Sequence, residues 1–189
     1  MESVGFKEWA LICEALGRGE QSIILRKGGI AEGRDGFAFK HREFFLFPTF
    51  FHEQVEKLRG SAREIPTQTE GQIEIGFFAR LESSFLLTDW ETAAALEPFH
   101  LWRTEVVRER FEYDSPVGLH IGLVRVYSLR PRWIFPDAPR YGGCRSWVNL
   151  PELPRDTQLD PVLTDAKHAR RIDELNAVVQ NRGLQPSAR

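Results

Sequence analysis

The clearest pattern of apolar and polar positions lies at residues 43–47, where four apolar side chains follow one another. Phe44 and Leu46 would lie on one face of an extended strand, and Phe45 and Phe47 on the other. A strand that is apolar on both faces belongs in the interior of a sheet that is covered on both sides. The pattern therefore predicts a central strand.

Further strands are predicted from alternating or β-branched segments. Residues 104–113 and 118–129 alternate over their length, and the segment DSPV between them has the composition of a turn. These two segments are predicted to form an antiparallel hairpin. Shorter strand patterns occupy residues 22–27, 37–39, 72–82 and 146–150.

Apolar positions at helical spacing predict the helices. The first helix is expected within residues 4–16, and a second one within 49–59, after Pro48 has ended the central strand. A third begins at Thr88 or Asp89 as its cap. The last is predicted to open at Asp160 and Pro161, with Ile172, Leu175 and Val179 facing inward. Hairpins mixed with helices indicate an α+β protein with a curved or barrel-like, mostly antiparallel sheet flanked by three to four helices.

Length and composition set broad limits. The 189 residues fit a single domain over 1–189, in which 151–189 is a helical extension that begins with prolines. A formal net charge of −2 announces neither a polyanion-binding protein nor an acidic tail. No apolar run approaches the ~20 residues that cross a bilayer, and the first residues lack the features of a signal peptide. We therefore expect a cytoplasmic protein, with no membrane contact, in which Cys13 and Cys144 are reduced thiols.

The chain resembles a bacterial family known as domain of unknown function 1802 in three stretches, QSIILRKGGIAE, FFLFPTFFHEQ and YGGCRSWVNL. Between or before them, in the expected order, lie EWALICEAL, HLWRTEV and LVRVYSL, so the resemblance extends over most of the chain. The family has no settled activity, cofactor or catalytic residues. The resemblance therefore implies a stand-alone bacterial cytoplasmic protein and no particular chemistry.

A glycine-rich segment with basic neighbours follows the strand predicted at 22–27. Arg26, Lys27 and Arg34 flank glycines whose backbone amides suit a phosphate group. The segment matches neither a Walker motif nor GxGxxG, and it lacks the paired glutamates of a Nudix hydrolase. The alternative is a plain connection between strands.

Polar residues around the predicted corner between strand and helix form a second candidate site. His41 and Glu43 would lie on the same side of a strand and His52 in the first helical turn, which suits a metal site of two histidines and one carboxylate. The same spacing is typical of a solvated strand end, so no metal is assigned. Backbone amides at the start of the helix favour an anion near His52 and Arg42.

Cys144 follows two glycines, and the neighbouring Arg145 would favour its thiolate, which makes it a candidate nucleophile. No histidine is adjacent in the sequence. The alternative, a small buried cysteine that leads into the strand at 146–150, is the interpretation that we expect.

Eight arginines, no lysine and five acidic residues lie between Arg103 and Arg145, with tryptophan and tyrosine interleaved. The guanidinium groups of Arg108, Arg110 and Arg125 suit phosphates and stack on bases, so the segment is the predicted nucleic-acid surface. In the alternative, these arginines form the solvated face of a sheet and pair with carboxylates.

These patterns favour two classes of function. The first is a non-enzymatic binding module for an anionic, phosphate-containing ligand or nucleic acid, which would rest on the arginine-rich sheet and on the loop at Arg26 and Lys27. The alternative is a metal-dependent or phosphate-directed hydrolase or nuclease that uses His41, Glu43 and His52. The sequence indicates neither a cofactor nor an oligomeric state.

Overall fold

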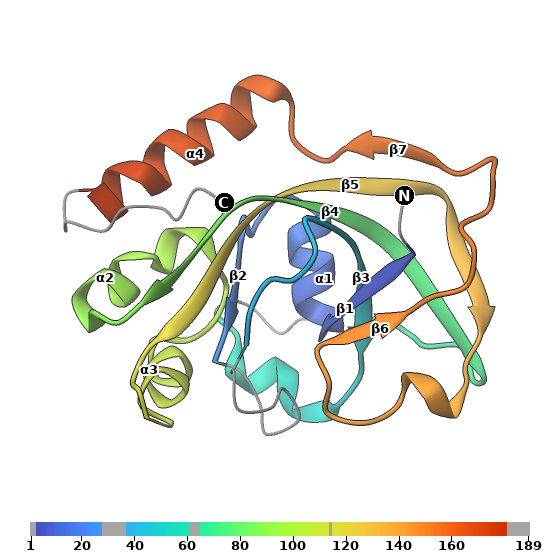
Figure 1. Ribbon diagram of the computed structural model, residues 1–189, viewed down its shortest axis with the longest axis horizontal. Helices are drawn as coiled ribbons and strands as arrows, with labels where there is room; N and C mark the ends of the chain where they lie inside the picture. The colour runs from blue at the N-terminus through green and yellow to red at the C-terminus, as the bar shows by residue number, and fades with distance from the viewer. Residues whose placement is uncertain (1–2, 28–36, 61–64, 114, 181–189) are drawn as a thin grey trace.

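The computed structural model describes residues 3–27, 37–60, 65–113 and 115–180, without the side chains of His52 and Glu53. In this part of the chain an open, mostly antiparallel sheet of seven strands runs in the order β2-β5-β4-β3-β1-β6, with β7 paired to β5 (Figure 1). β1 and β3 are parallel neighbours. The strands are β1 (Val4–Trp9), β2 (Ile23–Arg26), β3 (Glu43–Thr49), β4 (Gln72–Leu87), β5 (Leu119–Pro136), β6 (Trp147–Asn149) and β7 (Gln158–Pro161).

Four α-helices accompany the sheet in the described ranges, which confirms the α+β class. Helix α1 packs against β1, β3, β4 and β5, and α2 and α3 contact each other at one end of the sheet (Figure 1). The helices are α1 (Ala10–Gly17), α2 (Trp90–Ala95), α3 (Thr104–Glu112) and α4 (Asp165–Gln180), and 3-10 turns occupy η2 (His52–Lys57), η3 (Glu97–Phe99) and η4 (Pro139–Tyr141).

The predicted central strand is confirmed as β3, which lies between β4 and β1. Phe44 and Leu46 belong to the larger hydrophobic core, which includes α1. Phe45 and Phe47 belong to a second core, built mainly from β4, β5 and β6. Both faces of β3 are therefore buried, as its sequence requires.

The sheet owes its second core to the length and curvature of β4 and β5. Their pairing shifts register between Ile75 and Phe77 and again between Leu81 and Ser83. Such irregularities increase local twist and bend the bulged strand. The far half of β5 therefore packs its own side chains, among them Trp133, over the Phe45 face of β3.

The predicted strand over residues 104–113, and its hairpin with 118–129, are wrong, because α3 occupies the first segment. Val106 and Val107 are adjacent, which already interrupts a strict alternation. The helix buries both of them together with Phe111. The partner of β5 is β4, along nearly the whole of both strands.

The predicted helix within residues 4–16 is correct only in its second half. The first half is strand β1, which lies between β3 and β6 and is buried along most of its length. The helical spacing that predicted this element begins only at Trp9, immediately before α1. A strand buried by neighbours on both sides therefore replaces the first half of the predicted helix.

The corner after β3 also differs from its prediction. Pro48 and Thr49 still belong to β3, and only the short 3-10 turn η2 follows, where a helix over 49–59 was expected. The pairing of β3 with β4 ends at Phe45. Pro48 therefore lies where one side of the strand has no ladder partner, a position that tolerates proline.

Two further segments depart from the expected elements. Residues 37–39 form no strand, although Phe37 is buried against Phe6. Residues 158–161 form β7, so the C-terminal helix begins only at Asp165. Leu175 and Val179 are buried as predicted, and Ile172 is partly buried at the same core.

Candidate anion-binding pocket

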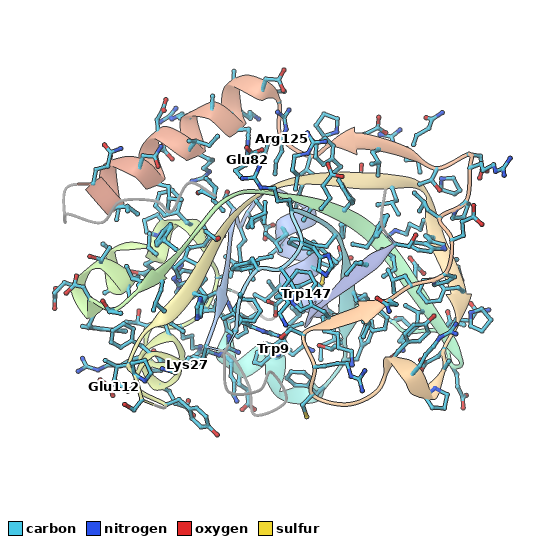
Figure 2. All side chains as sticks on the ribbon, viewed as in Figure 1. Trp9, Lys27, Glu82, Glu112, Arg125 and Trp147 are labelled. Carbon is cyan, nitrogen blue, oxygen red and sulfur yellow. The ribbon has the colours of Figure 1, made fainter. Side chains whose placement is uncertain are left out.

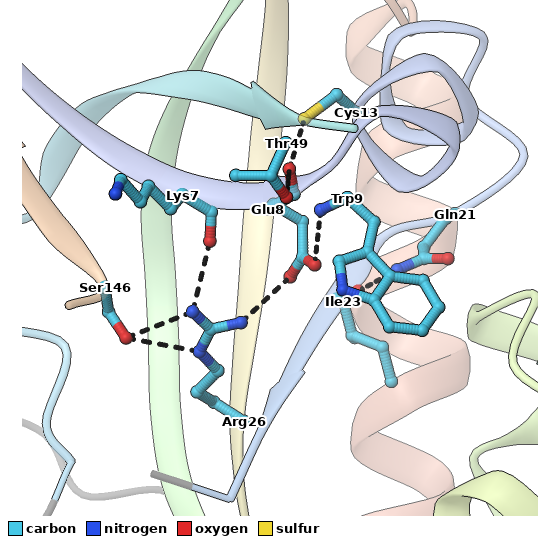
Figure 3. A network of polar contacts seen from close by, with 9 residues as sticks. All are labelled: Lys7, Glu8, Trp9, Cys13, Gln21, Ile23, Arg26, Thr49 and Ser146. Carbon is cyan, nitrogen blue, oxygen red and sulfur yellow. Dashed lines mark hydrogen bonds and ion pairs between the residues drawn. The ribbon is translucent and has the colours of Figure 1, made fainter. Parts of the chain in front are cut away.

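Arg26 lies at the end of β2 and connects segments that are distant in the sequence (Figure 3). Its Nη2 donates to the carbonyl oxygen of Lys7 at 3.2 Å and to Oγ of Ser146 at 3.1 Å. Its Nη1 lies 4.0 Å from Oε2 of Glu8. These contacts hold the guanidinium group against β1 and the segment before β6.

Glu8 supplies a buried carboxylate beside Arg26. Its side chain is 2% exposed, and its Oε1 accepts a hydrogen bond from the backbone nitrogen of Trp9 at 2.8 Å. A buried charge is costly unless it is paired and hydrogen-bonded. Glu8 therefore depends on Arg26, and the pair helps to hold the guanidinium group of Arg26 in place.

Arg110, on α3, carries the second guanidinium group. It stacks 3.7 Å from the ring centre of Trp102 and 5.0 Å from that of Trp9. In the part of the chain that the structure describes, it makes no hydrogen bond or ion pair. Burial lowers the pKa of Arg110 to about 10, and nearby Arg26 acts in the same direction against Glu8. The group therefore stays charged near neutral pH without a bonded counterion.

A pocket of about 250 Å³ opens beside these groups. Its lining includes Arg26, Lys27 and Arg110, together with the side chains of Tyr113 and Cys144. The loop at β2 and helix α3 thus bring together three of the cationic residues that the sequence assigned to two separate surfaces. We call this the Arg26–Arg110 pocket.

Lys27 also ties the end of α3 to the pocket. Its Nζ donates to the carbonyl oxygens of Phe111 at 3.3 Å and Pro116 at 2.9 Å. Glu109 is the one carboxylate among the described residues that line the pocket. Glu8 lies behind Arg26, so three cationic groups stand against two carboxylates, and the remaining positive charge attracts anions.

The other predicted arginines lie elsewhere. Arg108 pairs with Glu112 one helical turn away, at 2.8 Å, and stacks on Trp90. Arg125 is hydrogen-bonded to Asp165, which raises the pKa of this arginine. Figure 2 shows Arg125 at the edge near α4, far from Lys27 near α3. The continuous arginine-rich hairpin surface expected from the sequence does not form.

The predicted metal corner is only partly described. The ring of His41 packs 4.9 Å from that of Trp147, and Glu43 pairs with Arg80 at 3.1 Å. His41 and Glu43 line a separate open pocket of about 580 Å³, to which Arg42 also belongs. The side chain of His52 lies outside the described part, as does all of Arg34. Within the described residues no three metal-ligating side chains gather.

The expectation that Cys144 is buried is wrong. Both cysteines are free thiols, but Cys13 is the buried one, and Cys144 is exposed on the wall of the Arg26–Arg110 pocket. Gly142 ends the preceding 3-10 turn η4, and Gly143, which directly precedes Cys144, adopts a left-handed φ of 79°. The site therefore contains an accessible thiol.

We expect Cys144 to react with iodoacetamide near pH 7 at least about tenfold faster than Cys13, because exposure and thiolate content govern thiol reactivity. Burial, helped by the carboxylates of Glu8 and Glu14, raises the pKa of Cys13 well above its ordinary value. Peptide mass spectrometry after timed labelling gives both rates. The variant Cys144→Ser is the control and should lose the fast phase, whereas equal rates at the two cysteines would contradict the assignment.

Sequence reasoning missed Lys7, Glu8 and the partners of Arg110. Lys7 is 8% exposed, and its Nζ donates to the carbonyl oxygens of Gly142 at 3.1 Å and Gly143 at 2.9 Å. Burial, with Arg145 nearby, lowers the pKa of Lys7. In the predicted helix, Lys7 and Glu8 would lie on the polar face. In strand β1, which is covered on both faces, both side chains are buried.

Comparisons with curated proteins and with solved structures find at most distant similarity to this chain. A search of curated proteins finds no match. Among solved structures, ASCH from Zymomonas mobilis shares 12% identity, with a TM-score of 0.42 over 91% of this chain and 94% of that one. A serine-to-alanine mutant of the same protein shares 12% identity, with a TM-score of 0.46 over 92% and 96%. A similarity this distant carries no information about the ligand.

In the described ranges no helix is long and apolar enough to cross a membrane.

The resemblance noted in the sequence is confirmed by a family model. The model described as Domain of unknown function (DUF1802) matches residues 5–174, and the chain therefore belongs to this family.

Proposed function

We propose that this protein binds an anionic, phosphate-bearing ligand in the Arg26–Arg110 pocket. The observation that carries the proposal is the guanidinium group of Arg110. It is held against two tryptophan rings, it lines a pocket, and it has no bonded counterion in the described part of the chain. A phosphate oxygen is the partner that such a group lacks.

The two guanidinium groups are prepared for the same ligand in different ways. The two indole rings restrict the movement of the Arg110 guanidinium group, which also lines the pocket. Arg26 is held by Lys7, Glu8 and Ser146. Positions fixed in advance reduce the entropy that binding costs.

Many arginines outside the pocket are paired with carboxylates, which favours the pocket over the rest of the described surface as the anion site. Several arginines of the described surface contact a carboxylate within about 3 Å. These pairs are Arg80–Glu43 at 3.1 Å, Arg108–Glu112 at 2.8 Å, Arg130–Asp160 at 2.8 Å, Arg132–Glu74 at 2.9 Å and Arg170–Glu174 at 2.8 Å. Because these charges are locally compensated and that of Arg110 is not bonded to a described carboxylate, the pocket is the better-supported anion site.

The proposal is tested with a fluorescein-labelled, single-stranded hexanucleotide in fluorescence anisotropy at low salt. Replacing Arg110 with glutamine should weaken binding about tenfold or more, because a charge-assisted hydrogen bond is lost. The slope of log affinity against log salt should fall by about 0.7 for each lost phosphate contact. The matched control is Arg108→Gln, two positions along the same helix, which should bind as wild type does.

A second variant keeps the test valid if Arg110→Gln destabilises α3. Arg110→Lys retains the charge but loses the planar, bidentate edge, so its salt slope should stay close to that of wild type while its affinity falls. Circular dichroism melting establishes that each variant is folded. Failure of wild type to bind at low salt would remove nucleic-acid strands as ligands, and equal weakening by Arg108→Gln and Arg110→Gln would refute the proposal.

The alternative from the sequence, a metal-dependent or phosphate-directed hydrolase at His41, Glu43 and His52, stays a prediction. Elemental analysis of protein purified without an affinity tag tests it directly, because such a site would hold stoichiometric metal.

A further inference from the structure

Tyr113 is the exposed aromatic residue of the Arg26–Arg110 pocket. It follows the last residue of α3, it lies three positions after Arg110, and its side chain is 70% exposed while lining the pocket. No ring of the described residues packs against it. Nucleic-acid bases stack on exposed aromatic side chains that lie beside cationic side chains, as Tyr113 does here.

The size of the pocket limits what it holds. Its volume of about 250 Å³ lies just below the roughly 300–1,000 Å³ that is usual for small-molecule sites. One phosphate and one sugar fill such a space, and a base beyond them would reach the rim. A duplex or a long strand would need further free cations along its backbone, whereas the neighbouring Arg108 is occupied by Glu112.

From these observations we infer that the ligand of the pocket is a nucleotide, bound one at a time, with its phosphate on Arg110, beside the positive charge of Arg26, and its base stacked on Tyr113. This inference rests on the proposed function and adds the chemical class of the ligand. It requires two separable contributions. The phosphate contribution depends on Arg110, and the base contribution depends on Tyr113.

Protection of Cys144 from iodoacetamide provides the assay, because the thiol lies on the wall of the same pocket. The probes are inorganic phosphate, ribose 5-phosphate, adenosine 5′-monophosphate and cytidine 5′-monophosphate. Both nucleotides should protect at concentrations about tenfold below that of ribose 5-phosphate, because a stacked base contributes to affinity whatever its identity.

The variants separate the base from the phosphate. Tyr113→Ala should remove the advantage of the nucleotides over ribose 5-phosphate, and Tyr113→Phe should keep it, because the phenyl ring still stacks. Arg110→Gln should weaken protection by ribose 5-phosphate and by both nucleotides to the same degree. Tyr113 is exposed, so neither of its substitutions should change the melting temperature.

The outcomes distinguish this inference from the proposed function. If ribose 5-phosphate protects wild type as well as the nucleotides do, or if Tyr113→Ala binds as wild type does, the nucleotide assignment is wrong and the anion site stands. If oligonucleotides of two to ten residues show a salt slope that grows with length, the ligand is a strand and binding of one nucleotide at a time is wrong. If no phosphate-bearing probe protects Cys144 and Arg110→Gln has no effect, both proposals fall.

Discussion

Replacing Phe45 with alanine should lower the free energy of unfolding by about 3–5 kcal/mol, the usual cost of truncating a fully buried phenylalanine. Phe45 has 0% exposure, and its ring lies 5.3 Å from that of Phe78 and 5.0 Å from that of Trp133. These neighbours come from β4 and the far half of β5, which are fixed by the sheet and cannot readily close the cavity. The loss should therefore lie toward the upper end of the range.

Urea unfolding followed by circular dichroism measures this loss. The control is Ile134→Ala, a truncation on β5 at a side chain that is 54% exposed, which should cost less than about 1 kcal/mol. The dependence on denaturant should keep its slope in both variants if the native and unfolded states expose the same surface as before. An unchanged midpoint for Phe45→Ala at an unchanged slope would contradict the placement of β3 between two cores.

Elements with a strong local signal could be predicted from the sequence. Four successive apolar residues required a strand covered on both faces, and β3 has two cores. Thr88 or Asp89 is the predicted cap, and it is the carboxylate of Asp89 that accepts from the backbone nitrogen of Thr92 at 2.8 Å. Both features depend on neighbours in the sequence, which is why the sequence alone predicts them.

Elements whose conformation depends on tertiary neighbours could not be predicted. Residues 104–113 combine apolar and charged positions in a way that fits either a strand or a helix, and packing against α2 and the end of the sheet selects the helix. Residues 4–9 are a strand because β3 and β6 pair with them from distant parts of the chain. Local patterns carry no information about such partners.

The cationic residues of the candidate pocket were named from the sequence, but the sequence did not predict that they lie together. Arg26, Lys27 and Arg110 were assigned to phosphate binding, the first two in a glycine loop and the third on a hairpin. Because the segment forms helix α3 and not a strand, Arg110 packs on Trp102 and lies in the same pocket as the end of β2. Cys144 joins them from a third segment. A pocket made by three distant segments becomes visible only in the folded chain.

His100 gives the fold a dependence on pH that is independent of the pocket. Its side chain is 3% exposed, and its Nδ1 accepts a hydrogen bond from the backbone nitrogen of Trp102 at 3.1 Å. Burial, together with the positive charge of Arg59, lowers the pKa of His100 to about 3. The folded protein therefore holds this imidazole neutral with its Nδ1 unprotonated.

We expect the stability of the wild type to fall on acidification relative to that of His100→Asn. The unfolded His100 titrates near 6.5 and the folded one near 3, so between these values the unfolded state binds one more proton and acid favours unfolding. Well below pH 6.5 stability should decrease by about 1.4 kcal/mol per pH unit, which amounts to about 3 kcal/mol by pH 4. Asparagine places an oxygen near the position of Nδ1, so it can still accept from Trp102, and it does not titrate. Urea unfolding of both proteins between about pH 7.5 and pH 4 measures the difference, in which the contributions of all other groups cancel. Parallel stability profiles for the two proteins would show that His100 is not buried in its neutral form.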